Sequence, residues 1–254
     1  MTLPPEVLDK ILEHVPVTEG RPTLIACSLV ATWWTGPSQR RLFFSVSISG
    51  RNYQRWMNGV VLPESKSHLL EHVRSLWHCR GPDLKIAYRM RDLPHDSGEY
   101  FSALRNLRDL TLFNTRVERI SEEGFRTCFS AFRETLTSLS LDTFPTTFSA
   151  FVTLVGYFPN IRTLQLRQFT LEPGGGQVPR LPQPLRGKAH IAHIGASVAD
   201  FALFFHRFAE LDLEYEELVI DSSCVMRKRF LVGALQISAG TVKYLRLVVG
   251  PHRE

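Results

Sequence analysis

The chain has 254 residues, and 44% of them are hydrophobic, which is enough for one or two domains with their own apolar core. Its four cysteines lie far apart with no C-x-x-C pair, a spacing that argues against a disulfide framework and against a zinc site. The formal net charge is +5. Because there is no leader pattern and no apolar run near the roughly 20 residues that span a bilayer, we expect a soluble cytoplasmic or nuclear protein without membrane contacts.

The first part of the chain predicts three short helices. The first begins at Pro4-Pro5, where the fixed φ of proline and its missing N–H cost nothing, and ends at Pro16. The second lies between Pro22 and Gly36, and the third runs from Pro37 to Phe44. A helical unit of about forty residues cannot bury enough surface alone, so it is expected to need a partner.

These helices resemble an F-box, and specifically the fungal F-box-like family. The matching residues are Leu3-Pro4, Glu6-Val7, Ile11-Leu12, Leu24, Cys27-Ser28-Leu29-Val30, Trp34 and Leu42-Phe43. The chain departs from the family in having Thr32 where a basic residue is usual, and in its doubled tryptophan. The resemblance implies that the helices dock on a Skp adaptor, and through it on a cullin. The implied adaptor-binding residues are Leu3, Pro4, Glu6, Val7, Ile11, Leu24, Leu29, Val30 and Trp34. The alternative is a helical cap that only covers the next domain.

From residue 71 onward a Leu-x-x-Leu-x-Leu pattern returns about every 24 to 34 residues. The residues taken as equivalent are Leu76, Leu110, Leu139, Leu164, Ile194, Leu218 and Leu245. The last two leucines of the pattern point to one side of a strand, and the first fills the same core at the start of that strand. Helical stretches separate the strands, so the sequence predicts an α/β fold in which repeats stack into an irregular leucine-rich-repeat solenoid with a parallel sheet on its concave face. An ordinary doubly wound α/β domain is the alternative.

We expect an F-box at residues 1–46, a transition segment at 47–70, and a repeat arc at 71–254 that contains a loop at 173–187. Within the transition segment, Tyr53–Trp56 favours a helix, and the alternation of Val46 and Ile48 favours a strand. The positions between the buried leucines should face the concave side and bind a target. They are Thr111, Phe113, Ser138, Ser140, Thr163, Gln165, Arg167, Val219, Tyr244 and Arg246.

The last strand predicted is 242–249, with only five residues after it. We expect no covering helix there, and therefore an open edge that favours self-association. The alternative is that this arc is a shortened form of a longer one.

No reaction is predicted. Gly195-Ala196-Ser197-Val198-Ala199 has Ala where a nucleophile elbow needs its last glycine. His68 and His72 are four residues apart, as two metal ligands on a helix would be, but no Glu-x-x-His core accompanies them. We expect no enzymatic activity, no metal and no cofactor.

The resemblance, which extends over nearly the whole chain, implies a substrate-recognition subunit of a Skp, cullin and F-box (SCF) type ubiquitin ligase. The repeat arc would then bind an unknown target protein. The alternative is a repeat protein that binds RNA or an acidic protein partner through segment 38–91, which has ten Lys or Arg against three Asp or Glu. That segment lacks a pattern of stacking aromatics, so no specific nucleic acid is expected.

Overall fold

The computed structural model describes residues 3–16, 19–79, 101–115, 122–143, 145–172, 181, 185–192, 213–221 and 242–248. These residues form a mixed α/β structure around one parallel sheet of eight strands. The strands are β1 (Ser45–Ser49), β2 (Ser75–Cys79), β3 (Asp109–Phe113), β4 (Ser138–Asp142), β6 (Thr163–Arg167), β8 (Leu185–Ala192), β9 (Leu213–Asp221) and β10 (Tyr244–Val248). Two further strands, β5 (Pro145–Thr147) and β7 (Thr170–Glu172), pair with each other in a small parallel sheet.

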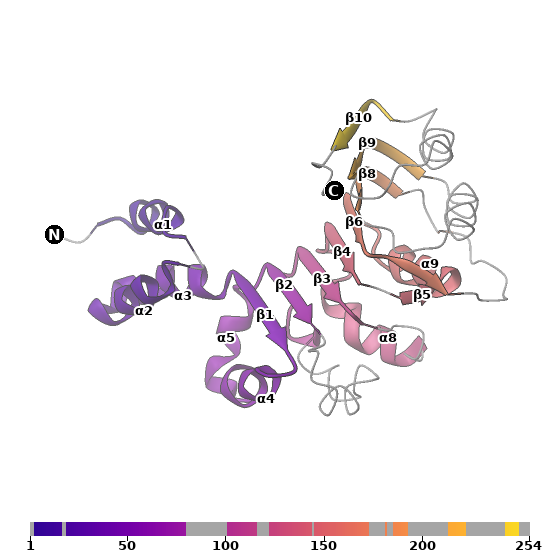
Figure 1. Cartoon of the computed structure of the whole chain (residues 1–254). Coiled ribbons are helices and arrows are strands. Elements are labelled where there is room, and N and C mark those ends of the chain that lie inside the picture. The colour runs from indigo at the N-terminus through magenta and orange to yellow at the C-terminus, as the bar shows by residue number, and fades with distance from the viewer. Residues whose placement is uncertain are drawn as a thin grey trace, which may run out of the picture.

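The strands of the main sheet lie side by side in the order in which they occur along the chain, from β1 to β10. They form a curved row whose outer side carries helices α4, α5, α8 and α9 (Figure 1). These helices span Tyr53–Trp56, Ser67–Leu70, Glu122–Phe129 and Phe148–Tyr157, with a π-helical turn at Met57–Val61 and 3-10 turns at Glu64–Lys66 and Ser130–Phe132. Among the described residues no helix lies on the opposite, inner side of the row (Figure 1), and we call this side the open face of the sheet.

Three helices precede the sheet, as the proline positions predict: α1 (Pro5–Glu13), α2 (Arg21–Val30) and α3 (Thr32–Phe43). Helix α3 starts at Thr32 and not at Pro37, because the extended backbone of Ala31 ends α2 and lets the next helix begin at once. Arg40 Nη2 donates to both carboxylate oxygens of Asp9, at 2.8 and 2.9 Å. This contact joins α3 to α1.

Two apolar rows run across the sheet on the side of the outer helices. All strand pairs are parallel, and their registers align one row of Val46, Leu76, Leu110, Leu139, Leu164, Ala189 and Leu218 and a second row of Ile48, His78, Leu112, Leu141, Leu166 and Ile191. Every member of both rows is buried. The residues at the first position of the pattern, Val73, Leu107, Leu136 and Ile161, are buried as well, so the predicted role of all three apolar positions is confirmed.

Phenylalanines fill the space between the sheet and the outer helices. The rings of Phe129, Phe132 and Phe158 are fully buried, and their centroids lie 5.7 to 5.9 Å apart. Phe101 joins them at 5.5 Å from Phe129. Rings of this size bury far more apolar area than an aliphatic side chain, which explains how short helices can cover the sheet.

The register corrects three predictions about where the strands and the loop lie. The sheet begins at Ser45, because β1 pairs with β2, so the predicted transition segment includes part of the first strand of the arc. The fifth equivalent position is Ala189 and not Ile194, since Ala189 pairs with Leu164 and with Leu218. Strand β8 therefore starts at Leu185, inside the predicted loop 173–187.

Side chains before each strand join neighbouring repeats through backbone oxygens. Asn106 Nδ2 donates to the carbonyl oxygen of Glu71 at 3.0 Å, and Asn160 Nδ2 donates to that of Glu134 at 2.8 Å. Both asparagines occupy the position just before the first apolar residue of the pattern. At the equivalent position the hydroxyl of Thr135 donates to the Leu107 carbonyl at 2.8 Å.

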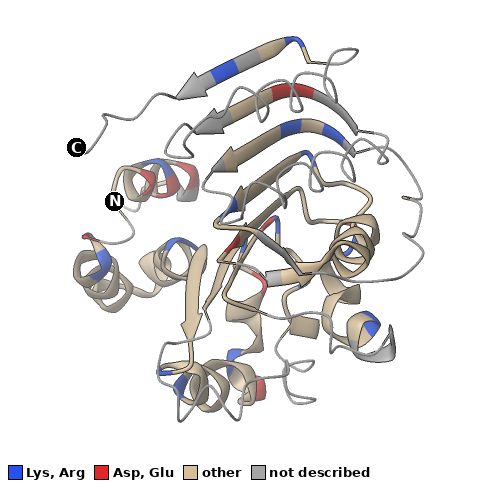
Figure 2. Ribbon diagram, turned by 45° about the vertical axis from the view of Figure 1, so that its right-hand side comes forward, with Lys and Arg blue, Asp and Glu red and all other residues tan. Residues whose placement is uncertain are grey.

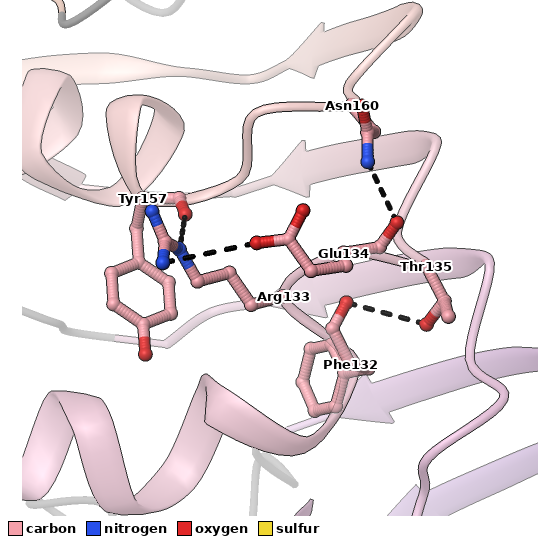
Figure 3. Close-up of polar contacts among 6 residues, drawn as sticks. All are labelled: Phe132, Arg133, Glu134, Thr135, Tyr157 and Asn160. Atoms are coloured by element: carbon pink, nitrogen blue, oxygen red, sulfur yellow. Dashed lines mark hydrogen bonds and ion pairs between the residues drawn. The ribbon is translucent and has the colours of Figure 1, made fainter.

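Arg133 adds a second link at the same place. Its Nε donates to the carbonyl oxygen of Tyr157 at 3.0 Å, and its guanidinium lies 5.4 Å from the centre of the Tyr157 ring (Figure 3). Figure 3 shows Asn160 and Arg133 reaching between consecutive repeats from opposite directions. The loops before the strands therefore fix the spacing of the repeats.

The first prediction concerns Gly187, which has a φ of +109°. A Cβ at this position would lie 2.2 Å from the carbonyl oxygen of Arg162, and that oxygen accepts the N–H of Lys188 at 2.7 Å. Gly187→Ala should lower the free energy of unfolding by at least about 2 kcal/mol, because both the φ and the contact are unfavourable for alanine. Gly59→Ala is the matched control, since a Cβ there meets nothing within 4 Å. Equal urea midpoints for the two variants would contradict the close packing of β8 on β6.

The second prediction concerns His78, which replaces a leucine in the buried row. Burial lowers the pKa of His78 to about 4, whereas the pKa of histidine in an unfolded chain is about 6.5. Between these pH values the unfolded state therefore binds more protons than the folded state. The contribution of His78 to the free energy of unfolding is fully present above about pH 6.5 and is lost as the pH falls toward 4. The free energy of unfolding can be measured by urea titration at pH 7.5 and at pH 4.5. Its decrease between these two pH values should be about 2 to 3 kcal/mol smaller for His78→Leu than for the native chain. His14→Gln, at an exposed site, should leave the loss unchanged. A parallel pH dependence for native chain and His78→Leu would disprove the assignment.

Candidate functional site

The described residues offer two surfaces with exposed side chains, one on the first helices and one on the sheet. No group of three or more His, Cys, Asp or Glu side chains within them is placed to hold a metal ion. Of the histidines considered above, His68 lies on α5, His72 follows that helix and His78 is buried in the sheet. The segment 195–199 lies outside the described residues. In the parts of the chain with described structure, no helix has the length and apolar character to cross a membrane.

The first surface, here called the helical surface, consists of apolar side chains of α1 and α2 and of the residues before α1. Leu29 is 80% exposed and Val30 is 73% exposed. Leu3, Val7, Ile11 and Ile25 are each exposed by more than 40%. Most of these are the residues that the resemblance assigns to adaptor binding, and Pro4 and Glu6 are exposed beside them. Exposed aliphatic side chains in this number are typical of surfaces that bind other proteins.

Two of the residues assigned to adaptor binding are less exposed than the rest of the helical surface. Leu24 is fully buried, so its assignment as a contact residue is corrected: it packs inside the helical unit and supports the surface from below. Trp34 is only partly exposed, and its ring centroid lies 5.5 Å from that of Trp33. The type of an apolar residue does not show whether its position is in the core or at the surface. The sequence analysis therefore assigned Leu24 and Trp34 to the same group as the exposed residues.

The second surface is the open face of the sheet. All ten residues predicted for target binding lie on it, because each alternates with a buried residue in its strand or is paired in register with residues that do. One row across the strands contains Ser47, Trp77, Thr111, Ser140, Gln165, His190, Val219 and Arg246. A second row contains Ser49, Cys79, Phe113, Asp142 and Arg167. The register thus brings the predicted residues together on one face.

The sequence reasoning missed Trp77, which is the largest side chain on the open face. Trp77 is 38% exposed, and its ring centroid lies 5.8 Å from that of Phe113 on the next strand. The signal was present, because Leu76 was already taken as equivalent to Leu110, and that places Trp77 beside Thr111. Asp109 and Asp142 were missed for the same reason.

The open face changes character toward its C-terminal strands. Lys188 Nζ pairs with Glu217 Oε2 on the open face. Lys243 Nζ pairs with Glu216 Oε1 at 3.0 Å at the residues next to this face, since Glu216 precedes Glu217 and Lys243 precedes β10. The alternating blue and red bands on the last strands in Figure 2 show these opposite charges. Large side chains on the open face are found at both ends of the sheet, with Trp77 on β2 38% exposed and Tyr244 on β10 70% exposed.

The basic segment 38–91 is described as far as Cys79. Several of its arginines make contacts inside the protein: Arg40 pairs with Asp9, Arg41 Nη2 donates to the Glu13 carbonyl at 3.1 Å, and Arg74 Nη1 donates to the Glu71 carbonyl at 2.5 Å. These side chains hold helices and loops in place. The charge excess of the segment therefore overstates how much positive charge it offers to a partner.

Comparison with known proteins adds no relationship to this description. Neither a scan against models of protein families nor a search of curated proteins finds a match for the chain.

Proposed function

We propose that the chain is a substrate-recognition subunit of an SCF type ubiquitin ligase. In this proposal α1 to α3 are an F-box that docks on a Skp adaptor, and the sheet domain holds a target protein. The observation that carries the proposal is the helical surface, where Leu29 and Val30 are almost fully exposed at the end of α2. Such a surface on a helical unit too small to fold around its own core fits an adaptor-binding element.

The architecture of the rest of the chain supports the same proposal. Parallel strands in chain order, a repeated pattern of buried leucines and helices on the outer side fit an irregular leucine-rich-repeat solenoid. Solenoids of this kind present a long inner face to protein partners. The open face that carries Trp77, Thr111 and Ser140 is then the target-binding surface.

The proposed mechanism requires no chemistry from this chain. One end binds the adaptor and the other binds the target, so the lysines of the target are held near the ubiquitin-conjugating enzyme carried elsewhere on the complex. The gain comes from effective concentration and orientation. Figure 1 supports this division, because α1 to α3 lie beyond the β1 edge of the sheet and leave the strands after it accessible.

The third prediction tests adaptor binding. Leu29→Ser combined with Val30→Ser should weaken binding to a purified Skp adaptor at least tenfold, because a fully buried aliphatic side chain contributes about 1.5 to 3 kcal/mol. The fold should remain intact, since both side chains are already in water. Isothermal titration calorimetry measures the affinity, and the native chain sets the reference.

Leu62→Ser is the matched control, because Leu62 is also exposed, at 55%, but lies in the sheet domain after the π-helical turn. It should bind the adaptor as the native chain does. If the native chain does not bind the adaptor at all, the proposal fails. If the double variant binds as well as the native chain, the helical surface is not the docking site.

A further inference from the structure

One aromatic pair lies on the open face of the sheet, with Trp77 exposed and Phe113 partly buried. Trp77 on β2 and Phe113 on β3 have ring centroids 5.8 Å apart, and their planes are inclined by 37°. Of the four tryptophans of the chain, only Trp77 lies in the sheet. Tryptophan is a frequent centre of binding energy at protein interfaces, so an indole that remains exposed here marks a place where a partner gains by covering it.

Small side chains surround the aromatic pair. In the row that crosses the strands at Trp77, the neighbours are Ser47, Thr111 and Ser140. These side chains are much shorter than an indole, and the Trp77 side chain is 38% exposed. A side chain that approaches from the inner side of the curve can therefore reach the indole.

A carboxylate lies directly beside the pair. Asp142 on β4 is paired in register with Phe113, and neighbouring strands are about 4.8 Å apart. Thr143 Oγ1 lies 3.2 Å from Asp142 Oδ1 and 2.8 Å from Gln168 Oε1, so its single hydroxyl hydrogen is shared between these two acceptors. Burial, and then the negative charge of Asp142, raise the pKa of the Cys79 thiol on the other side of Phe113.

Arg167 is the neighbour of Asp142 on β6, but the described residues show no ion pair between them. The carboxylate is therefore available to a partner. An aliphatic side chain placed on the rings would remove Asp142 from water without pairing its charge, which is unfavourable. An acidic side chain would be repelled. A cation is attracted both by the negative faces of the rings and by the carboxylate.

We infer that the aromatic site, formed by Trp77, Phe113 and Asp142, binds an arginine or lysine side chain that projects from the target protein. This inference rests on the proposed function and makes it more specific, because it names the class of target: a protein with an exposed basic residue in an accessible segment. The cation lies over the rings and its N–H groups donate to Asp142.

The fourth prediction tests this with four pools of fluorescein-labelled nine-residue peptides, with arginine, lysine, leucine or glutamate fixed at the centre and the other positions randomised. Fluorescence anisotropy with the full chain should show at least fivefold tighter binding of the arginine and lysine pools than of the leucine pool, and the weakest binding for glutamate. The chain itself carries a net charge of +5, so non-specific attraction would favour the glutamate pool. A preference for the basic pools therefore reports a local site.

Four variants localise the preference. Trp77→Ala and Asp142→Asn should each abolish it, and the second change alters charge with little change of shape. Trp33→Ala is the matched control, because Trp33 is also 38% exposed but lies on α3. Arg167→Ala should keep the preference or strengthen it, since it removes a competing cation. Equal affinities for all pools, a preference for leucine or glutamate, or a basic preference that survives either Trp77→Ala or Asp142→Asn would each overturn the inference.

Adaptor binding by the same preparations separates this inference from the proposed function. Trp77→Ala and Asp142→Asn should bind the Skp adaptor as the native chain does, because neither residue is on the helical surface. If the native chain binds the adaptor but shows no preference for basic pools, the aromatic site is wrong and the proposed function stands. If it selects basic peptides but does not bind the adaptor, the aromatic site stands and the ligase assignment fails.

Discussion

The register of the parallel strands is the constraint on which the rest of the structure depends. Side chains in a strand alternate between its two faces, so a shift by one residue would move the buried leucines into water and the serines and threonines into the core. Backbone groups at the start of each strand oppose such a shift. The carbonyl oxygens of Phe44, Arg74, Arg108 and Thr137 each accept two consecutive N–H groups of the next strand. Each strand thereby sets the register of its neighbour.

The same constraint arranges the open face. Once Leu76, Leu110 and Leu139 are aligned in the core, Trp77, Thr111 and Ser140 must be aligned on the other side. The chain can therefore vary the residues of the open face without changing the residues that determine stability. If the open face binds a target as proposed, the alternation of the strands separates the residues for binding from the residues for folding.

Much of the fold could be predicted because leucines two residues apart in successive segments leave few alternatives to a strand. The predictions were wrong where a residue of another type takes the same place. Ala189 substitutes for a leucine in β8, and the positive φ of Gly187 places a bulge before it, so the pattern was read five residues too late. In the same way His78 occupies a leucine position, and its burial could not be inferred from a polar residue type.

The candidate surfaces were predictable to different degrees. Alternation alone places all ten predicted residues on the open face, because it needs only the positions of the leucines. The helical surface depends on which apolar residues are left uncovered, and the packing of three helices decides this. Leu24 and Leu29 are the same residue type on one helix, yet the first is fully buried and the second is 80% exposed. Only the three-dimensional arrangement distinguishes them.

The central claim is that separate surfaces of one chain bind the adaptor and the target. Amide hydrogen exchange of the full chain, measured with and without a saturating Skp adaptor, tests it most directly. The account predicts added protection in α1 and α2 and unchanged exchange in β2, β3 and β4, since the open face remains free. Added protection of the amides in those strands, with none in the helices, would show that the adaptor occupies the open face. That result would contradict the claim that the helical surface binds the adaptor and the open face binds the target.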